Sequence, residues 1–177
     1  MTAWSRVGAR GGAPTIAAID EPTRILFVCT GNICRSPTAE AVFRHKVREA
    51  GLDDVIEVGS AGMGGWHVGD GADSRAIKAW RARGYEHDHV ARQLRTTWRD
   101  DYDLFIACDT GHLMEIRSLL PGVETKLLRD WDPKGMGDVP DPYYDGPEAF
   151  DEVLDIVERS CDRLLEDLRG RLDQAAS

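Results

Sequence analysis

The short apolar run "RILFVC", Arg24–Cys29, is the feature that most constrains how this chain can fold. The run is rich in β-forming residues and bounded by polar segments, so it predicts a strand buried on both faces. Helical spacing of apolar residues begins soon afterwards, at positions 39, 42, 43, 47 and 50. Ser36 is predicted to cap this helix, Pro37 to occupy its first position, and Gly51 to end it.

The same alternation of strand and helix continues along the sequence. Strands are predicted at "DVIEVGSAG", "YDLFIACD" and "VETKLL", and helices at "GADSRAIKAWRARG" and "TGHLMEIRSLLPG". A long amphipathic helix follows, with one apolar stripe from Phe150 to Leu168. This order predicts an α/β fold: a single domain with an open four-stranded parallel sheet and helices on both faces.

Length and composition fit that prediction. The chain has 177 residues, of which 42% are hydrophobic and 30% charged, as expected for one globular domain. We assign residues 22–172 to this domain. Residues 1–21 are rich in Gly and Ala without a continuous apolar core, so we expect a flexible extension rather than a secretory signal.

Charge and cysteine usage narrow the function classes. A formal net charge of -9 argues against broad binding to nucleic acid or to anionic membranes, and no stretch approaches the ~20 apolar residues of a membrane span. Four cysteines do not make a disulfide framework in a chain this long. They favour a reducing, cytoplasmic setting in which some cysteines serve chemistry.

The loop that follows the first strand has the residue types of an anion-binding site. Five residues separate Cys29 from Arg35, and Gly31 and Asn32 between them tolerate unusual backbone angles. Such a strand-to-helix loop turns its backbone N–H groups inward, and Arg35 can grip two oxygens of a phosphate group. The same positive field stabilises a thiolate. The pattern therefore predicts a nucleophilic Cys29 at the floor of a phosphate cradle, the layout for covalent phosphoryl transfer.

Other uses of this loop fit less well. A zinc site at Cys29 and Cys34 would need two further ligands at suitable spacing, and the sequence offers no such pair. A Walker loop is excluded because Gly-Lys-Ser/Thr is absent. A purely anion-binding loop would leave the thiol of Cys29 without a purpose.

Four motifs in fixed order add a resemblance to a known family. The Cys-x5-Arg-Ser loop in "CTGNICRSPTAE", followed by "GSAGMGGWHVG", "DHVARQ" and "DPYY", resembles the low-molecular-weight protein-tyrosine phosphatases over most of Arg24–Leu168. The resemblance implies hydrolysis of phosphotyrosine in proteins through a phosphocysteine, with no metal or other cofactor. It implies that Cys29 attacks phosphorus, that Arg35 holds the phosphate oxygens, and that Asp141 acts as general acid and base.

The sequence itself also favours Asp141 as the acid. In "PDP" the residue lies between two prolines, a stiff setting that can aim a carboxyl group. Asp138 and Asp145 lie nearby and are rivals, with a solvated acidic loop as their simpler interpretation.

The resemblance also implies supporting roles. Ser36 would donate a hydrogen bond to the Cys29 sulfur, and Asn32 would hold the loop in shape through Ser60 and His89. The residues expected to line the substrate site from the loop are Thr30, Gly31, Asn32, Ile33, Cys34 and Ser36. His112 stands where the resemblance leads us to expect Asn, and we predict that it affects the rim of the site and not the cradle.

Three aromatic residues are candidates for the walls of the site. Trp66, Tyr143 and Tyr144 have Gly-rich or Pro-rich flanks, which favour loops, although core packing is the commoner use of Trp and Tyr. A deep aromatic slot would suit a phenyl phosphate and leave a short phosphoserine unable to reach the floor. His45 and His87 are predicted at the surface, and His67 near the site has no assigned role.

Several alternatives stay open at this point. An arsenate reductase shares the fold and loop, although a closely spaced cysteine relay is lacking. A phosphoarginine phosphatase is also possible, although the apolar Ile33, where that branch carries Thr, suits a ring better than a guanidinium. A non-catalytic phosphate-binding module would not need Cys29 or Asp141. Cys34 fits either a small buried filler or a disulfide partner for oxidised Cys29.

Overall fold

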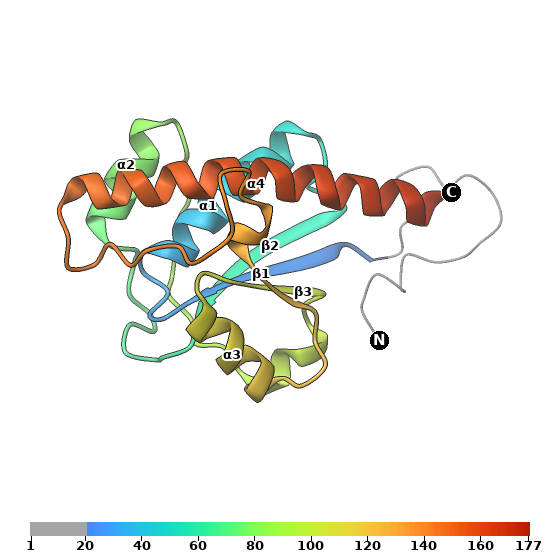
Figure 1. Cartoon of the computed structure of the whole chain (residues 1–177), viewed down its shortest axis with the longest axis horizontal. Coiled ribbons are helices and arrows are strands. Elements are labelled where there is room, and N and C mark those ends of the chain that lie inside the picture. The colour runs from blue at the N-terminus through green and yellow to red at the C-terminus, as the bar shows by residue number, and fades with distance from the viewer. Residues whose placement is uncertain (1–20) are drawn as a thin grey trace.

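The computed structural model describes residues 21–177, so the expected extension at 1–21 lies outside the described residues except for its last position. Four parallel strands form one sheet in the order β2-β1-β3-β4. They are β1 (Thr23–Cys29), β2 (Ile56–Gly62), β3 (Leu104–Ala107) and β4 (Thr125–Leu127). The predicted open parallel sheet is confirmed, with β1 at an inner position (Figure 1).

Helices cover both faces of this sheet. The helices α1 (Arg35–Glu49), α2 (Ser74–Ala82) and α4 (Pro147–Ala176) pack together on one face, and α3 (Thr110–Leu119) lies on the other (Figure 1). Two short 3₁₀ helices, Thr96–Asp100 and Leu128–Trp131, complete the described elements and were not predicted.

The apolar composition of β1 follows from its position between these two layers. Ile25 and Phe27 belong to the core beneath α1 and α4, whereas Leu26 and Val28 belong to the core beneath α3. Because successive side chains of a strand point to opposite faces, a strand covered on both sides must be apolar throughout. Phe27 also meets Phe43 of α1 edge to face, with ring centroids 5.8 Å apart. Each such fully buried side chain contributes about 1.5–3 kcal/mol to folding.

The start of α1 differs from the prediction. The helix begins at Arg35 with Cys34 at its N-cap, and no side chain caps it. Ser36 lies in the first turn, and its hydroxyl points back to the end of β1 instead of to the helix N–H groups. The prediction of Ser36 as the cap is therefore wrong. The predicted end is confirmed, since the helix stops at Glu49 and Gly51 has the positive φ of 67° that a helix terminator adopts.

The long helix α4 packs on α1 through the predicted apolar stripe. Its buried positions run from Phe150 to Leu172 at helical spacing, and its opposite face is charged. Within residues 21–177, no helix has the length and apolar character that crossing a membrane requires.

All four strands run the same way, so their carboxyl ends meet at one edge of the sheet. Cys29 at the end of β1 lies in register with Gly62 at the end of β2, and Asp109 follows β3 at the same edge. This is the edge at which open α/β sheets place their ligands.

Candidate active site

The loop between β1 and α1 makes a tight curl at Asn32. Asn32 has a φ of 58° and, among residues 21–177, is the one non-glycine residue with positive φ. Such a left-handed residue within a turn points consecutive N–H groups to the same side. Gly62 allows this curl to lie against β2, because a Cβ at that position would be 2.8 Å from the Thr30 carbonyl oxygen and 3.0 Å from the Asn32 nitrogen.

Beneath the loop, a buried chain of hydrogen bonds leads to the Cys29 sulfur. Ser36 Oγ lies 2.9 Å from Cys29 Sγ, and the Asn32 side-chain amide donates to Ser36 Oγ at 2.8 Å and to Ser60 Oγ at 2.9 Å. Because Ser36 accepts from Asn32, its own proton is available for the sulfur. Ser36 can therefore donate a hydrogen bond to the Cys29 sulfur.

Glu40 of α1 anchors the far end of that chain. Ser60 Oγ donates to Glu40 Oε2 at 2.5 Å, which makes Ser60 an acceptor for Asn32. Burial favours the neutral acid, but the contacts with His87 and His89 and the hydrogen bond from Ser60 hold the pKa of Glu40 well below its usual value. The surface position predicted for His87 is wrong, because only 10% of its side chain is exposed and its ring lies beside Glu40.

His89 and the backbone of residue 92 hold the two oxygens of Asn32. His89 Nε2 lies 2.7 Å from the Asn32 carbonyl oxygen, and the Arg92 N–H donates to Asn32 Oδ1 at 2.9 Å. Asn32 is fully buried, and every polar group of its side chain is hydrogen-bonded. These bonds offset the cost of its left-handed backbone.

Arg35 is fixed behind the loop from two sides. Its Nη1 donates to Asp109 Oδ2 at 2.9 Å and to the Val139 carbonyl oxygen at 3.1 Å, and its Nη2 donates to Thr30 Oγ1 at 3.3 Å. Burial favours neutral Asp109, but hydrogen bonds from His112 and Arg35 hold its pKa below the ordinary value. Asp109 is therefore a charged partner of the Arg35 guanidinium. The sequence did not predict this contact, although Asp109 directly follows an apolar run that predicts a strand.

His112 also belongs to the cradle. Its Nε2 lies 2.8 Å from Thr30 Oγ1, and its Nδ1 lies 3.1 Å from Asp109 Oδ1. The ring is buried, and this burial lowers the pKa of His112. The prediction that His112 affects only the rim is therefore wrong, because it contacts the loop that would surround a phosphate group.

A pocket of about 220 Å³ opens above the cradle. Cys29 lies at its floor and is almost fully buried. The residues that line it are Cys29, Thr30, Gly31, Ile33, Cys34, Arg35, Trp66, His67, Asp141, Tyr143 and Tyr144. The structure thus brings together the predicted nucleophile, the predicted clamp, the predicted acid and the three predicted aromatic walls. Of the predicted site residues, Asn32, Ser36, Ser60 and His89 lie behind the pocket wall.

The carboxyl group of Asp141 faces the guanidinium of Arg35. Asp141 Oδ2 lies 3.6 Å from Arg35 Nη2, and Oδ1 accepts from the Tyr143 N–H at 3.1 Å. The rival Asp138 is engaged elsewhere, since its Oδ1 accepts from both the N–H and the hydroxyl of Thr110. Neither Asp138 nor Asp145 lines the pocket. The geometry therefore favours Asp141 as the acid.

A family model described as "Low molecular weight phosphotyrosine protein phosphatase" matches residues 24–174 of this chain. The low molecular weight protein-tyrosine-phosphatase of Streptomyces coelicolor is 47% identical over 161 residues, which cover 87% of this chain and 98% of that protein. This chain belongs to the low-molecular-weight phosphotyrosine protein phosphatase family. The resemblance drawn from the four motifs is thereby confirmed.

Solved structures of the family share the fold. A protein tyrosine phosphatase from Entamoeba histolytica superimposes with a TM-score of 0.81 at 34% identity, over 84% of this chain and 97% of that chain. A Drosophila arginine phosphatase superimposes with a TM-score of 0.77 at 30% identity, over 82% of this chain and 97% of that one. The fold of this phosphatase family therefore accommodates proteins named for two different substrates.

The cysteines of this family member differ in environment. Cys34 lines the pocket but is nearly buried, and burial raises the pKa of its thiol to about 12. Cys108 and Cys161 are fully buried in the core beneath α1 and α4, and burial raises the pKa of each. All four are free thiols in the structure. A disulfide between Cys34 and an oxidised Cys29 stays a prediction.

Proposed function

We propose that this chain is a protein-tyrosine phosphatase that acts through a phosphocysteine on Cys29. One observation carries the proposal. Cys29 lies at the floor of a pocket that Arg35 and Asp141 also line. Aromatic side chains form the rim of this pocket. A binding module needs the cradle but neither a buried thiol at its floor nor an acid beside it. We propose phosphotyrosine-containing proteins as its substrates and the cytoplasm as its location.

In the first step, the Cys29 thiolate attacks phosphorus in line with the phenolic oxygen. The S–P bond forms, the P–O bond to the tyrosine breaks, and Asp141 gives its proton to the leaving phenolate oxygen. Asp141 must therefore be protonated when substrate is bound. Its side chain is half exposed and lines the pocket, where it can reach the leaving-group oxygen of a substrate bound in the cradle.

In the second step, water removes the phosphoryl group from sulfur. Asp141, now a carboxylate, takes a proton from the water, whose oxygen attacks phosphorus as the S–P bond breaks. The departing thiolate is stabilised by the Ser36 hydroxyl, 2.9 Å from the sulfur. Inorganic phosphate leaves, and Asp141 is again protonated for the next turnover.

Arg35 stabilises both transition states in this scheme. A planar guanidinium can hold two equatorial oxygens of a transferring phosphoryl group, with backbone N–H groups of the loop on the others. Asp109, Val139 and Thr30 fix one edge of the group before substrate arrives. Preorganised donors of this kind are the largest contributors to such catalysis, because no reorganisation is needed when the charge develops.

The depth of the pocket supports phosphotyrosine as the substrate. Trp66 and Tyr144 are largely exposed at the mouth, whereas the sulfur at the floor is almost inaccessible. A phenyl ring can fill the space between mouth and floor while its phosphate reaches Cys29, which a short phosphoserine side chain cannot. Ile33 contributes an apolar wall, which suits a ring better than a charged guanidinium.

A direct comparison of substrates tests the proposal. Turnover is measured on peptides carrying phosphotyrosine, phosphoserine or phosphoarginine, and on arsenate with a thiol reductant. We expect phosphotyrosine to give the highest kcat/KM by at least tenfold. A preference for phosphoarginine, the activity for which the Drosophila relative is named, or reduction of arsenate, would overturn the proposal.

A further inference from the structure

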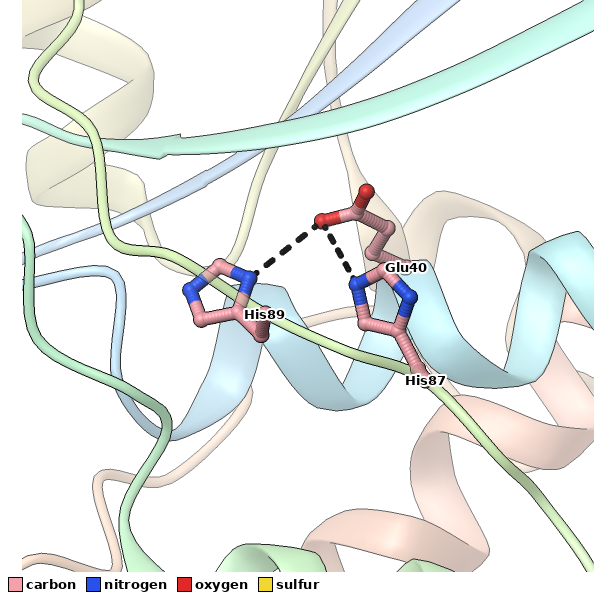
Figure 2. Close-up of side chains that lie close together, drawn as sticks. All are labelled: Glu40, His87 and His89. Carbon is pink, nitrogen blue, oxygen red and sulfur yellow. Dashed lines mark ion pairs between the residues drawn. The ribbon is translucent and has the colours of Figure 1, made fainter.

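A second group of chemically active side chains lies behind the phosphate loop, away from the pocket. Glu40 of α1 and two histidines of the segment before the 3₁₀ helix Thr96–Asp100 converge there, as Figure 2 shows. Glu40 Oε2 lies 3.4 Å from His87 Nε2 and 3.7 Å from His89 Nδ1. One ligand atom from each residue lies within 4.8 Å of the others.

These distances are close to those between ligands of one metal ion. Zinc binds imidazole nitrogen and carboxylate oxygen at about 2.0–2.1 Å, so two tetrahedral ligands lie about 3.3 Å apart. The His87–Glu40 separation already matches this value, and the His89–Glu40 separation exceeds it by a few tenths of an ångström. The two ring nitrogens lie within 4.8 Å of each other, and side-chain rotations that bring them closer would place all three atoms around one ion.

The hydrogen bonds of the two rings suit coordination. His89 Nε2 donates to the Asn32 carbonyl, so in the neutral ring Nδ1 carries a lone pair toward Glu40. A ring that donates one N–H to a backbone carbonyl is the usual support for a metal-binding histidine. His87 Nε2 is buried without a hydrogen-bond partner, although it faces the carboxylate. A buried ring nitrogen without such a bond is costly unless another partner satisfies it.

The surroundings leave room for an ion to enter. A cavity of about 370 Å³ is lined by Glu40, His87 and His89, together with Glu57 and Asp88 as further acidic groups. Two cations also line it: Arg92 donates to the Ser60 carbonyl, and Arg44 contacts the other carboxylate oxygen, Glu40 Oε1. The oxygen that faces the histidines is therefore separate from the one that Arg44 engages.

We propose that Glu40, His87 and His89 form a binding site for a divalent transition ion of the Zn²⁺ class. The ion would take Glu40 Oε2, His87 Nε2 and His89 Nδ1 as three ligands and water from the cavity as the fourth. Two imidazoles and one carboxylate select Zn²⁺ and its neighbours over Mg²⁺ or Ca²⁺, which prefer all-oxygen sites. The site does not depend on the proposed phosphatase activity.

Occupation of this site would be transmitted to the catalytic floor. Glu40 is linked through Ser60, Asn32 and Ser36 to the Cys29 sulfur, and His89 holds the Asn32 carbonyl. An ion bound to Glu40 and His89 would therefore fix two of the hydrogen bonds of Asn32, the one to Ser60 and the one from His89.

The test measures binding of Zn²⁺ by calorimetry and of Co²⁺ by visible absorption, with no substrate present. We expect one tight site in the full-length protein, with cobalt d–d bands of a nitrogen and oxygen site and no thiolate charge-transfer band. Zn²⁺ at about 100 times its Kd should raise the melting temperature by about 5–10 °C. His87→Gln should remove the tight site and this rise, and His45→Gln, at a partly exposed position of α1, should keep both.

A Cys29→Ser variant separates this site from metal bound at the nucleophile. We expect it to bind Zn²⁺ as the wild type does. Loss of binding in Cys29→Ser, unchanged binding in His87→Gln, or no tight binding to the wild type would each overturn the proposal. Normal melting of metal-free His87→Gln, measured in parallel, checks that the variant is folded, and Glu40→Gln provides a second ligand removal if it is not.

Discussion

Directly behind the floor of the pocket Asn32 and Ser36 are fully buried and joined by hydrogen bonds, whereas at its rim Trp66 and Tyr144 expose 76% and 92% of their surface. The floor lies at the end of β1 and in the first turn of α1, the inner strand and a packed helix. The rim is made by loops, one after β2 and one before α4.

This difference indicates that the floor serves the chemical step and that the rim serves the choice of substrate. A buried network with few alternative arrangements can hold a sulfur, a guanidinium and a phosphate in one geometry. Exposed aromatic side chains can adjust to peptides of different sequence, as loops commonly do. Changes at the floor should therefore affect turnover of every substrate, and changes at the rim should affect the ranking of substrates. The proposed acid Asp141, half exposed and 3.6 Å from Arg35, connects the two regions.

The largest effect is expected at the nucleophile. Cys29→Ser should reduce turnover of phosphotyrosine peptides by at least about 10⁴-fold, because a serine hydroxyl has no thiolate to attack with. Binding of inorganic phosphate, measured by calorimetry, should largely survive since the cradle is intact. A variant with near wild-type turnover would contradict the covalent mechanism and the division between floor and rim.

Removal of the acid should come next. Asp141→Asn should slow turnover of substrates with poor leaving groups by about 10²–10⁴-fold, and this loss should shrink for aryl phosphates whose leaving group needs no proton. Asp138→Asn is the matched control, because the Asp138 carboxylate lies outside the pocket and accepts its hydrogen bonds from Thr110. If the leaving-group dependence appears in the control and not in Asp141→Asn, the assignment of the acid is wrong.

A change at Asn32 tests whether the floor is as rigid as its hydrogen bonds indicate. Asn32→Ala would place alanine at a φ of 58° and remove the bonds to Ser36 and Ser60. We expect kcat to fall about 10²-fold and stability to fall by about 2–4 kcal/mol in denaturant titrations. Asn32→Gly removes the same bonds but tolerates the backbone angle. It should recover part of the stability but little of kcat; full recovery of kcat would mean that the bonds are dispensable.

The smallest effect is expected at the rim. Tyr144→Ala should lower kcat/KM for phosphotyrosine peptides by about 3–10-fold, the worth of one aromatic contact, with no change in melting temperature. The factor should vary with peptide sequence. Met136→Ala removes another exposed apolar side chain, which lies outside the pocket, and should change neither quantity. A uniform loss of kcat in Tyr144→Ala would place this residue with the floor.

The fold was predictable because its signals are local. A continuous apolar run marks a strand covered on both faces, and Ile25 and Leu26 indeed point into different cores. Helical periodicity and Gly51 marked α1 and its end. The residues of the pocket were predictable for a second reason, since parallel strands bring Cys29, Asp109 and their following loops to one edge.

The errors concern partners that no local pattern specifies. Ser36 has the composition of a helix cap, but the nearby Cys29 sulfur and Asn32 amide engage its hydroxyl instead. His87 lies in a polar segment with no periodicity, and only the packing of that segment on α1 buries it beside Glu40. Asp109 ends the stretch predicted as the third strand, but its contact with Arg35 joins residues 74 positions apart. Such pairings depend on tertiary geometry and not on spacing along the chain.

Gly62 carries no functional group and does not line the pocket, yet its missing side chain is what lets the phosphate loop lie against β2. Any other residue would bring a carbon atom into backbone that cannot move without opening the curl around Asn32. In a library that randomises every position, tolerance at the rim should therefore be broad, whereas position 62 should accept only glycine. Evolution would then restrict this position because of the space that a Cβ atom would occupy, and not because of any group that the residue supplies.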